Sequence, residues 1–137
     1  MGDILNLANK AIGDAPEEQV LANGTEAQIR IMAYKLDKDK NDKNYFMPVF
    51  DVPDEPNVRE FSKFMYIPDE SWMDEKKFNR ARRDFQEFGD AFGIDWDSGD
   101  IDLDSLIGTT AWAILGVKKA DGDFPESNSV RKFVSGN

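Results

Sequence analysis

Apolar and polar side chains alternate along several short stretches of the chain, and a period of two residues predicts β-strands. We expect strands over residues 26–36, 45–52, 60–67, 109–119 and 129–134. The second stretch is apolar on both sides, and Pro48 within it favours an edge strand or a bulge. In 109–119, small and aliphatic residues share one side, while Trp112 and Lys118 share the other. The pattern therefore predicts a mainly β protein.

One helix is predicted by apolar residues at intervals of three and four. These residues are Phe78, Ala81, Phe85, Phe88 and Phe92. Ser71 or Asp74 can cap the start of this helix, and Gly93 can end it. Residues 3–12 also have loosely helical apolar spacing, but so short a helix is marginal in isolation. We therefore expect residues 1–19 to be a short helix or an arm.

The order strand, strand, strand, helix, strand, strand is that of the OB-fold, a five-stranded Greek-key β-barrel in which the helix can close one end. Such a barrel would span residues 20–137, with the helix phenylalanines sealing its mouth and the strand edges paired. Another small α+β sheet has the same element order. The order alone leaves both architectures open.

The composition excludes many kinds of chemistry. The chain has 137 residues, 40% of them hydrophobic, which is enough for one domain with a core. It has no cysteine and no histidine, so disulfides, thiolate or imidazole metal sites and Ser-His-Asp triads are excluded. No apolar run could span a bilayer, and no signal segment opens the chain. We expect a soluble, cytoplasmic protein without membrane partners or cofactors.

An acidic stretch covers residues 95–104 and contains five aspartates. It fails the EF-hand pattern, because Gly99 falls one place too early and Leu106 stands where a bidentate glutamate is needed. Two-metal catalytic sites gather their ligands from several elements, whereas these aspartates share one loop. No metal site is predicted, and an enzyme is the least favoured class.

The charge is unevenly distributed. The net charge is -10, which argues against a general electrostatic attraction to duplex DNA or to anionic membranes. Residues 59–83 nevertheless carry seven basic against five acidic side chains, while residues 95–126 carry two against eight. This distribution is compatible with solvated helix faces and equally with a local basic surface.

A family resemblance is carried by four segments, in the order Phe61–Pro68, Phe78–Phe92, Leu106–Ala113 and Asn128–Phe133. Together they resemble bacteriophage single-stranded-DNA-binding proteins, which are small OB-fold proteins encoded near phage replication and recombination genes. The resemblance implies a non-catalytic protein that coats single-stranded DNA, with phage replication or recombination proteins as further partners. Many such proteins end in an acidic tail tipped by an aromatic residue. This chain ends Val134-Ser-Gly-Asn137, so recruitment through such a tail is not expected.

Binding of single strands requires cations along the phosphates and aromatic faces for the bases. OB-folds usually present them on strands two and three and on two flanking loops. The DNA-binding residues predicted here are Arg30, Tyr34, Tyr45, Arg59, Phe61, Lys63, Trp112 and Lys118. The first loop adds Lys38, Lys40 and Lys43. Tyr34, Phe61 and Trp112 are also compatible with core positions, and Tyr45 can begin a buried strand.

Two other functions fit parts of the sequence. The net charge and the aspartate-rich loop are compatible with an acidic DNA mimic that blocks a nuclease or restriction enzyme. A structural adaptor of a virion would use the barrel and the N-terminal segment for protein contacts. Self-association is compatible with each of these functions.

Overall fold

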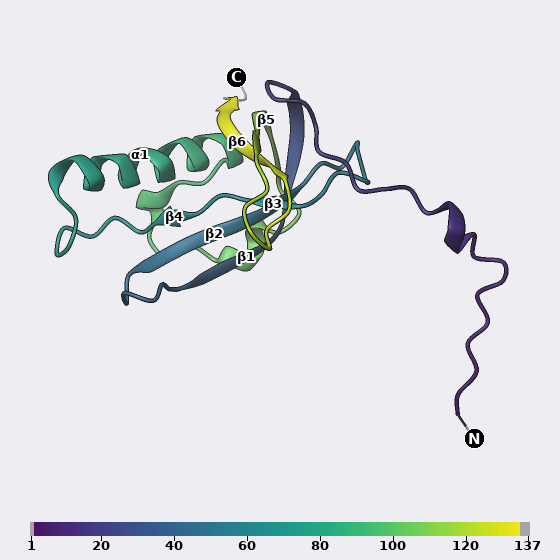
Figure 1. Cartoon of the computed structure of the whole chain (residues 1–137). Helices are drawn as coiled ribbons and strands as arrows, with labels where there is room; N and C mark the ends of the chain where they lie inside the picture. Colours follow the sequence, from purple (N-terminus) through teal and green to yellow (C-terminus); the bar gives the residue numbers. More distant parts are fainter. Residues whose placement is uncertain (1, 135–137) are drawn as a thin grey trace.

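The computed structural model describes residues 2–134, and the protein in it is mainly β with one long helix (Figure 1). The strands are β1 (Glu26–Lys38), β2 (Asn44–Asp51), β3 (Phe61–Ser62), β4 (Met65–Tyr66), β5 (Thr110–Lys118) and β6 (Ser127–Val134). The helices are α1 (Glu75–Phe92) and the short 3-10 turns η1 (Ile12–Asp14), η2 (Trp96–Ser98) and η3 (Leu103–Leu106). Between residues 2 and 134, no helix is both long enough and apolar enough to cross a bilayer.

The strands form one antiparallel sheet in the order β3-β2-β1-β5-β6, and β4 also pairs with β2. The sheet is open, because no ladder within residues 2–134 joins β3 to β6, although these two end strands contact each other. In Figure 1, α1 lies along one side of the curled sheet and the N-terminal segment extends away from it. The mainly β prediction is therefore confirmed.

The set of β1 residues that points toward the core changes in the middle of the strand. Ile29 and Ile31 are fully buried, as the alternation predicts, but Ala33 is exposed. The pairing with β2 shifts between Ile31 and Ala33, so β1 has one extra residue, Met32, at a β-bulge. Because side chains alternate with a period of two, one inserted residue exchanges the two faces. Tyr34 therefore points to the same side as the buried Ile29 and Ile31 and contacts the ring of Phe46.

Pro48 interrupts the ladder without placing β2 at an edge. β2 lies between β1 and the pair β3 and β4, so the edge prediction is wrong, and the bulge lies in β1. The Pro48 carbonyl accepts a hydrogen bond from the Lys63 N–H at 3.2 Å, but proline has no N–H to return. The register is the same on both sides of this gap. The predicted strand 60–67 is therefore divided into β3 and β4.

Helix α1 begins and ends with the predicted caps. The Asp74 carboxylate accepts a hydrogen bond from the Lys77 N–H at 2.7 Å, and Gly93 takes the left-handed conformation with φ of 74°. The apolar stripe packs against the sheet, with the fully buried Phe88 as its centre. Its ring lies 5.7 Å from that of Phe46 on β2 and 5.9 Å from that of Phe133 on β6. The helix thus joins strands from opposite halves of the sheet.

The acidic stretch forms two short turns. The carboxylates of Asp95 and Asp102 cap η2 and η3 by accepting backbone N–H groups two residues later. Asp104 accepts the Tyr34 hydroxyl at 2.6 Å. Three of the five aspartates therefore have local structural partners.

The N-terminal segment is exposed from residue 2 to residue 19, and only η1 within it is helical. Its base is attached to the domain, since Gln19 pairs with Val58 and Glu18 forms an ion pair with Arg59 at 2.6 Å. The prediction of a short helix or an arm over residues 1–19 stays a prediction. The tail residues 135–137 lie outside the described residues.

Candidate nucleic-acid interface

Two predicted residues lie exposed on the outer face of the sheet. The alternation in β5 is confirmed: Ala111, Ala113 and Leu115 are buried, and Trp112 is 47% exposed. Trp112 stands opposite Gln28 of β1 and Val134 of β6. Lys118, at the end of the same strand, is also exposed. Both side chains are therefore accessible to a ligand.

Three predicted residues are not exposed on the outer face. Phe61 is 4% exposed and its ring lies 5.7 Å from that of Phe50, so it belongs to the core and offers no face to a base. Lys63 lies half-buried between Phe61 and Met65, whose burial makes theirs the inner face. Tyr45 is 7% exposed, so its own ring cannot stack on a base. The prediction chose the wrong face of residues 61–66.

The remaining predicted residues have partners within the chain. The Arg30 guanidinium donates two hydrogen bonds to Asp51, at 3.1 and 2.6 Å, and this carboxylate raises the pKa of Arg30. Arg59 forms the ion pair with Glu18. The Tyr34 hydroxyl donates to Asp104, which raises the pKa of Tyr34. Each of these three side chains therefore already has an acidic partner within the chain.

A series of four aromatic side chains follows β2, β4 and the segment leading to α1. We call it the aromatic row: Tyr45, Phe64, Tyr66 and Trp72. Tyr45 and Tyr66 are directly paired across the strands. Phe64 stacks on Tyr45 with 4.6 Å between ring centroids. Tyr66 meets Phe64 edge-on at 4.8 Å and Trp72 edge-on at 5.1 Å. The row is thus continuous from the sheet to the loop before the helix.

Phe64 is the accessible ring of the row. It is 45% exposed, although one face rests on Tyr45. The buried Tyr45 therefore supports a ring whose solvent-facing side is free. An exposed aromatic held rigid by a second ring is well suited to stacking on an unpaired base, because little rotamer entropy remains to be lost.

Two ammonium groups flank the far end of the row. The Lys43 Nζ lies 5.0 Å from the centre of the Trp72 ring, and the Lys77 Nζ lies 5.2 Å from it. Lys43 comes from the β1–β2 loop and Lys77 from the first turn of α1. Cation–π attraction holds such groups beside the ring while their N–H donors stay available. Sites for single strands combine such cations, which contact phosphates, with rings that stack on bases.

A hydrogen bond fixes the β1–β2 loop to the row. The Tyr66 hydroxyl donates to the Asp39 carboxylate at 2.6 Å, and the same carboxylate accepts the N–H groups of Asn41 and Lys43. The tyrosine hydrogen bond, with help from the Lys43 N–H, lowers the pKa of Asp39. The carboxylate in turn raises the pKa of Tyr66. Lys43 is therefore held at a defined place.

The outer face of the sheet connects the row to Trp112. Directly paired residues share a face, so the pairs Asp37–Tyr45, Lys35–Met47 and Arg30–Asp51 lie along one side. The pair Gln28–Trp112 continues this face across β1. Gln28 and Asp37 are nine positions apart along β1, which is about 30 Å of strand at about 3.3 Å per residue. Lys35 is an exposed cation between them.

Sequence reasoning missed Phe64, Tyr66 and Trp72. The alternation in 61–66 did contain the signal, because it separated Phe64 and Tyr66 from Phe61 and Lys63. Which set points outward depends on the partner strand and cannot be read from 61–66 alone. Trp72 follows no periodic pattern, since it lies in the loop before α1.

No family model matches this chain, and no curated protein matches it either. Over residues 2–134, no cluster of three or more acidic side chains is arranged to hold a metal ion.

Proposed function

We propose that this protein binds single-stranded DNA without sequence preference, as a non-catalytic coat protein of phage replication or recombination. The observation that carries the proposal is the aromatic row with Lys43 and Lys77 at its end. Phe64 supplies the exposed stacking face, and the two ammonium groups supply phosphate contacts. This combination fits a strand whose bases are unstacked, because every base has an aromatic face.

We also propose that the open sheet is an OB-type barrel. Three features support this architecture: the strand order, the place of α1 between β4 and β5, and the contact between the end strands. The Phe50 ring bridges the opening, at 5.7 Å from Phe61 of β3 and 6.4 Å from Phe133 of β6. In OB-folds, ligands bind across strands two and three and the loop between strands one and two. The aromatic row occupies the corresponding place.

The net charge of -10 favours single strands over duplexes in this proposal. Acidic surroundings repel a nucleic acid that offers only phosphates. A single strand offers bases as well, and stacking contributes about 1–3 kcal/mol for each base. Attraction would thus be confined to a surface that combines rings with cations, as the aromatic row does with Lys43 and Lys77.

The direct test is fluorescence anisotropy of a labelled oligothymidine titrated with the protein. Binding is expected to weaken with salt, with a log–log slope of about -2 to -3 if three or four phosphates are neutralised. Duplex DNA of the same length should bind more weakly. A slope near zero, or a preference for duplex, would contradict the proposal.

Substitutions of one ring separate stacking from packing. Phe64→Leu keeps an apolar side chain of similar size but removes the aromatic face, and it is expected to weaken binding about 5- to 150-fold, the equivalent of one stacked base. Phe64→Tyr is the matched control and should bind like the wild type. If both variants bind equally well, the row is not the interface.

The same titration distinguishes the acidic-mimic function. A mimic of DNA would ignore every oligonucleotide and would instead bind a basic nuclease or restriction enzyme. Such an outcome would refute single-strand binding. An inert result with both ligands would favour the virion adaptor.

A further inference from the structure

Helix α1 has a basic first half and an acidic second half. Residues 84–92 carry three acids and no base, whereas residues 75–83 carry one acid and five bases. The five bases are Lys76, Lys77, Arg80, Arg82 and Arg83. The helix macrodipole favours the opposite arrangement, and like charges three or four positions apart repel each other. Because this distribution does not favour the helix itself, it indicates a negatively charged ligand at the first half.

Three of these bases form a ridge that begins at the aromatic row. Lys77, Arg80 and Arg83 follow one another at intervals of three, which places them on one oblique line of the helix surface. We call them the basic ridge. Successive Cβ atoms on such a line are about 5–6 Å apart. All three side chains are exposed, and the Lys77 Nζ lies 5.2 Å from the centre of the Trp72 ring. The ridge therefore leads from the row across the solvent side of α1.

The two arginines of the ridge have no acidic partner within the described structure. Asp84 and Glu87 stand one turn beyond Arg80 and Arg83, where an ion pair could form. The ion pairs found over residues 2–134 nevertheless all lie outside α1. The guanidinium groups of Arg80 and Arg83 are thus available to a ligand.

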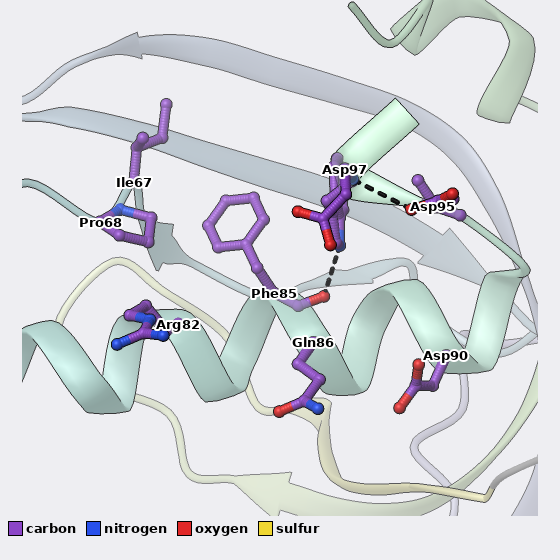
Figure 2. Close-up of a pocket in the computed structure, with 10 residues that line it drawn as sticks. Ile67, Pro68, Arg82, Phe85, Gln86, Asp90, Asp95 and Asp97 are labelled. Atoms are coloured by element: carbon purple, nitrogen blue, oxygen red, sulfur yellow. Dashed lines mark hydrogen bonds between the residues drawn. The ribbon is translucent and has the colours of Figure 1, made fainter. Parts of the chain in front are cut away.

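At its far end the ridge reaches a small hollow with many N–H donors. The hollow has a volume of about 230 Å³, and its lining consists of Asn79, Arg82, Arg83 and Gln86. The Arg82 guanidinium lies 5.3 Å from the centre of the Phe78 ring and donates to the Asn79 side-chain carbonyl at 3.4 Å. In Figure 2, Gln86 points to the side of α1 opposite to Phe85, whose ring faces Ile67. Two guanidinium groups and two amides are suited to the oxygens of a phosphate.

We propose that the basic ridge is an extension of the single-strand site that binds phosphates, so that a strand stacked on Phe64 leaves the aromatic row along α1. This inference rests on the proposed function, because it requires a strand at the row. Lys77, Arg80 and Arg83 contact successive phosphates without reading the bases, so the extension adds affinity and no sequence preference. Glu87 and Asp90 follow on α1 and repel phosphates, so the contact ends near the hollow.

The test compares two labelled oligothymidines by fluorescence anisotropy over a range of salt. One has about 4 nucleotides and covers the row, and the other has about 12 and also reaches the ridge, both within the range of OB-fold sites. Arg80→Gln/Arg83→Gln should make the log–log salt slope of the longer strand shallower by about 1.4, because each contacted phosphate of a single strand contributes about 0.7. In 0.1 M salt the longer strand should bind about tenfold more weakly or worse. Binding of the shorter strand should be unchanged.

Two matched variants separate the charge of the ridge from other effects. Arg80→Lys/Arg83→Lys keeps both charges, so it should retain the salt slope of the wild type. Lys10→Gln/Lys119→Gln removes the same charge from the N-terminal segment and the β5–β6 loop. It should bind both oligothymidines like the wild type.

Two outcomes would overturn this inference and leave the proposed function intact. In one, Phe64→Leu weakens binding of the shorter strand, but Arg80→Gln/Arg83→Gln leaves the salt slope of the longer strand unchanged. In the other, Lys10→Gln/Lys119→Gln weakens the longer strand as much as the ridge variant does, which would make the effect one of net charge. Failure of both oligothymidines to bind the wild type would instead refute the proposed function itself.

Discussion

Asn128 is the buried polar residue whose removal most directly tests the packing. It lies on β6 and is 2% exposed. Its side-chain carbonyl accepts the Leu21 N–H at 2.9 Å, and its amide donates to the carbonyls of Leu21 at 2.9 Å and Gly116 at 3.0 Å. The Asn128 side chain thus links β6 both to β5 and to the segment around Leu21, which connects residues 2–19 with β1. We expect Asn128→Ala to loosen this junction.

The magnitude follows from the three hydrogen bonds. Each contributes about 0.5–1.5 kcal/mol net, and a buried group left without a partner costs about 1–3 kcal/mol. Water can reach part of the opened site, because Leu21 is only half-buried. The free energy of unfolding is therefore expected to fall by about 2–4 kcal/mol.

Urea unfolding measures this change, and amide hydrogen exchange at Leu21 shows where it acts. Asn41→Ala in the exposed β1–β2 loop is the control, since no hydrogen bond of its side chain is present, and it should change stability by less than about 0.5 kcal/mol. Loss of less than about 1 kcal/mol in Asn128→Ala, with Leu21 exchange unchanged, would show that these hydrogen bonds do not stabilise the junction.

Three further predictions address the rest of the molecule. Tyr66→Phe removes the hydrogen bond that favours ionised Asp39, so NMR titration should show the pKa of Asp39 rising toward its ordinary value. In the wild type, the lowered pKa of Asp39 stabilises the folded state above the ordinary carboxyl pKa. This contribution is lost as the pH falls through the lowered pKa of the folded state. Gly89→Ala would place a Cβ 2.5 Å from the Trp96 Nε1, so it should destabilise the protein by about 1–3 kcal/mol in urea, and a gain would contradict the close approach. Trp112→Ala should weaken anisotropy-measured binding of long oligothymidines and spare short ones that reach only the aromatic row.

Local patterns were sufficient where the relevant neighbours are close in sequence. The stripe from Phe78 to Phe92 predicted α1, and Asp74 and Gly93 predicted its ends, because helix contacts and caps involve residues a few positions apart. The alternation in β5 also predicted the outward direction of Trp112. In each case the spacing of the apolar residues matched the period of the helix or strand that forms, so the buried side could be predicted locally.

The candidate interface was less predictable for a physical reason. Local residue patterns were enough to predict the mainly β character, the helix over Phe78–Phe92 and the alternating aromatics in 61–66. That Phe64 and Tyr66 face outward follows from tertiary packing, because Phe61 and Met65 pair with inward residues of β2 and α1 covers that side. The bulge at Met32 reversed the faces of β1 in the same way. Strand faces depend on register with partners distant in sequence, and a shift of one residue exchanges them.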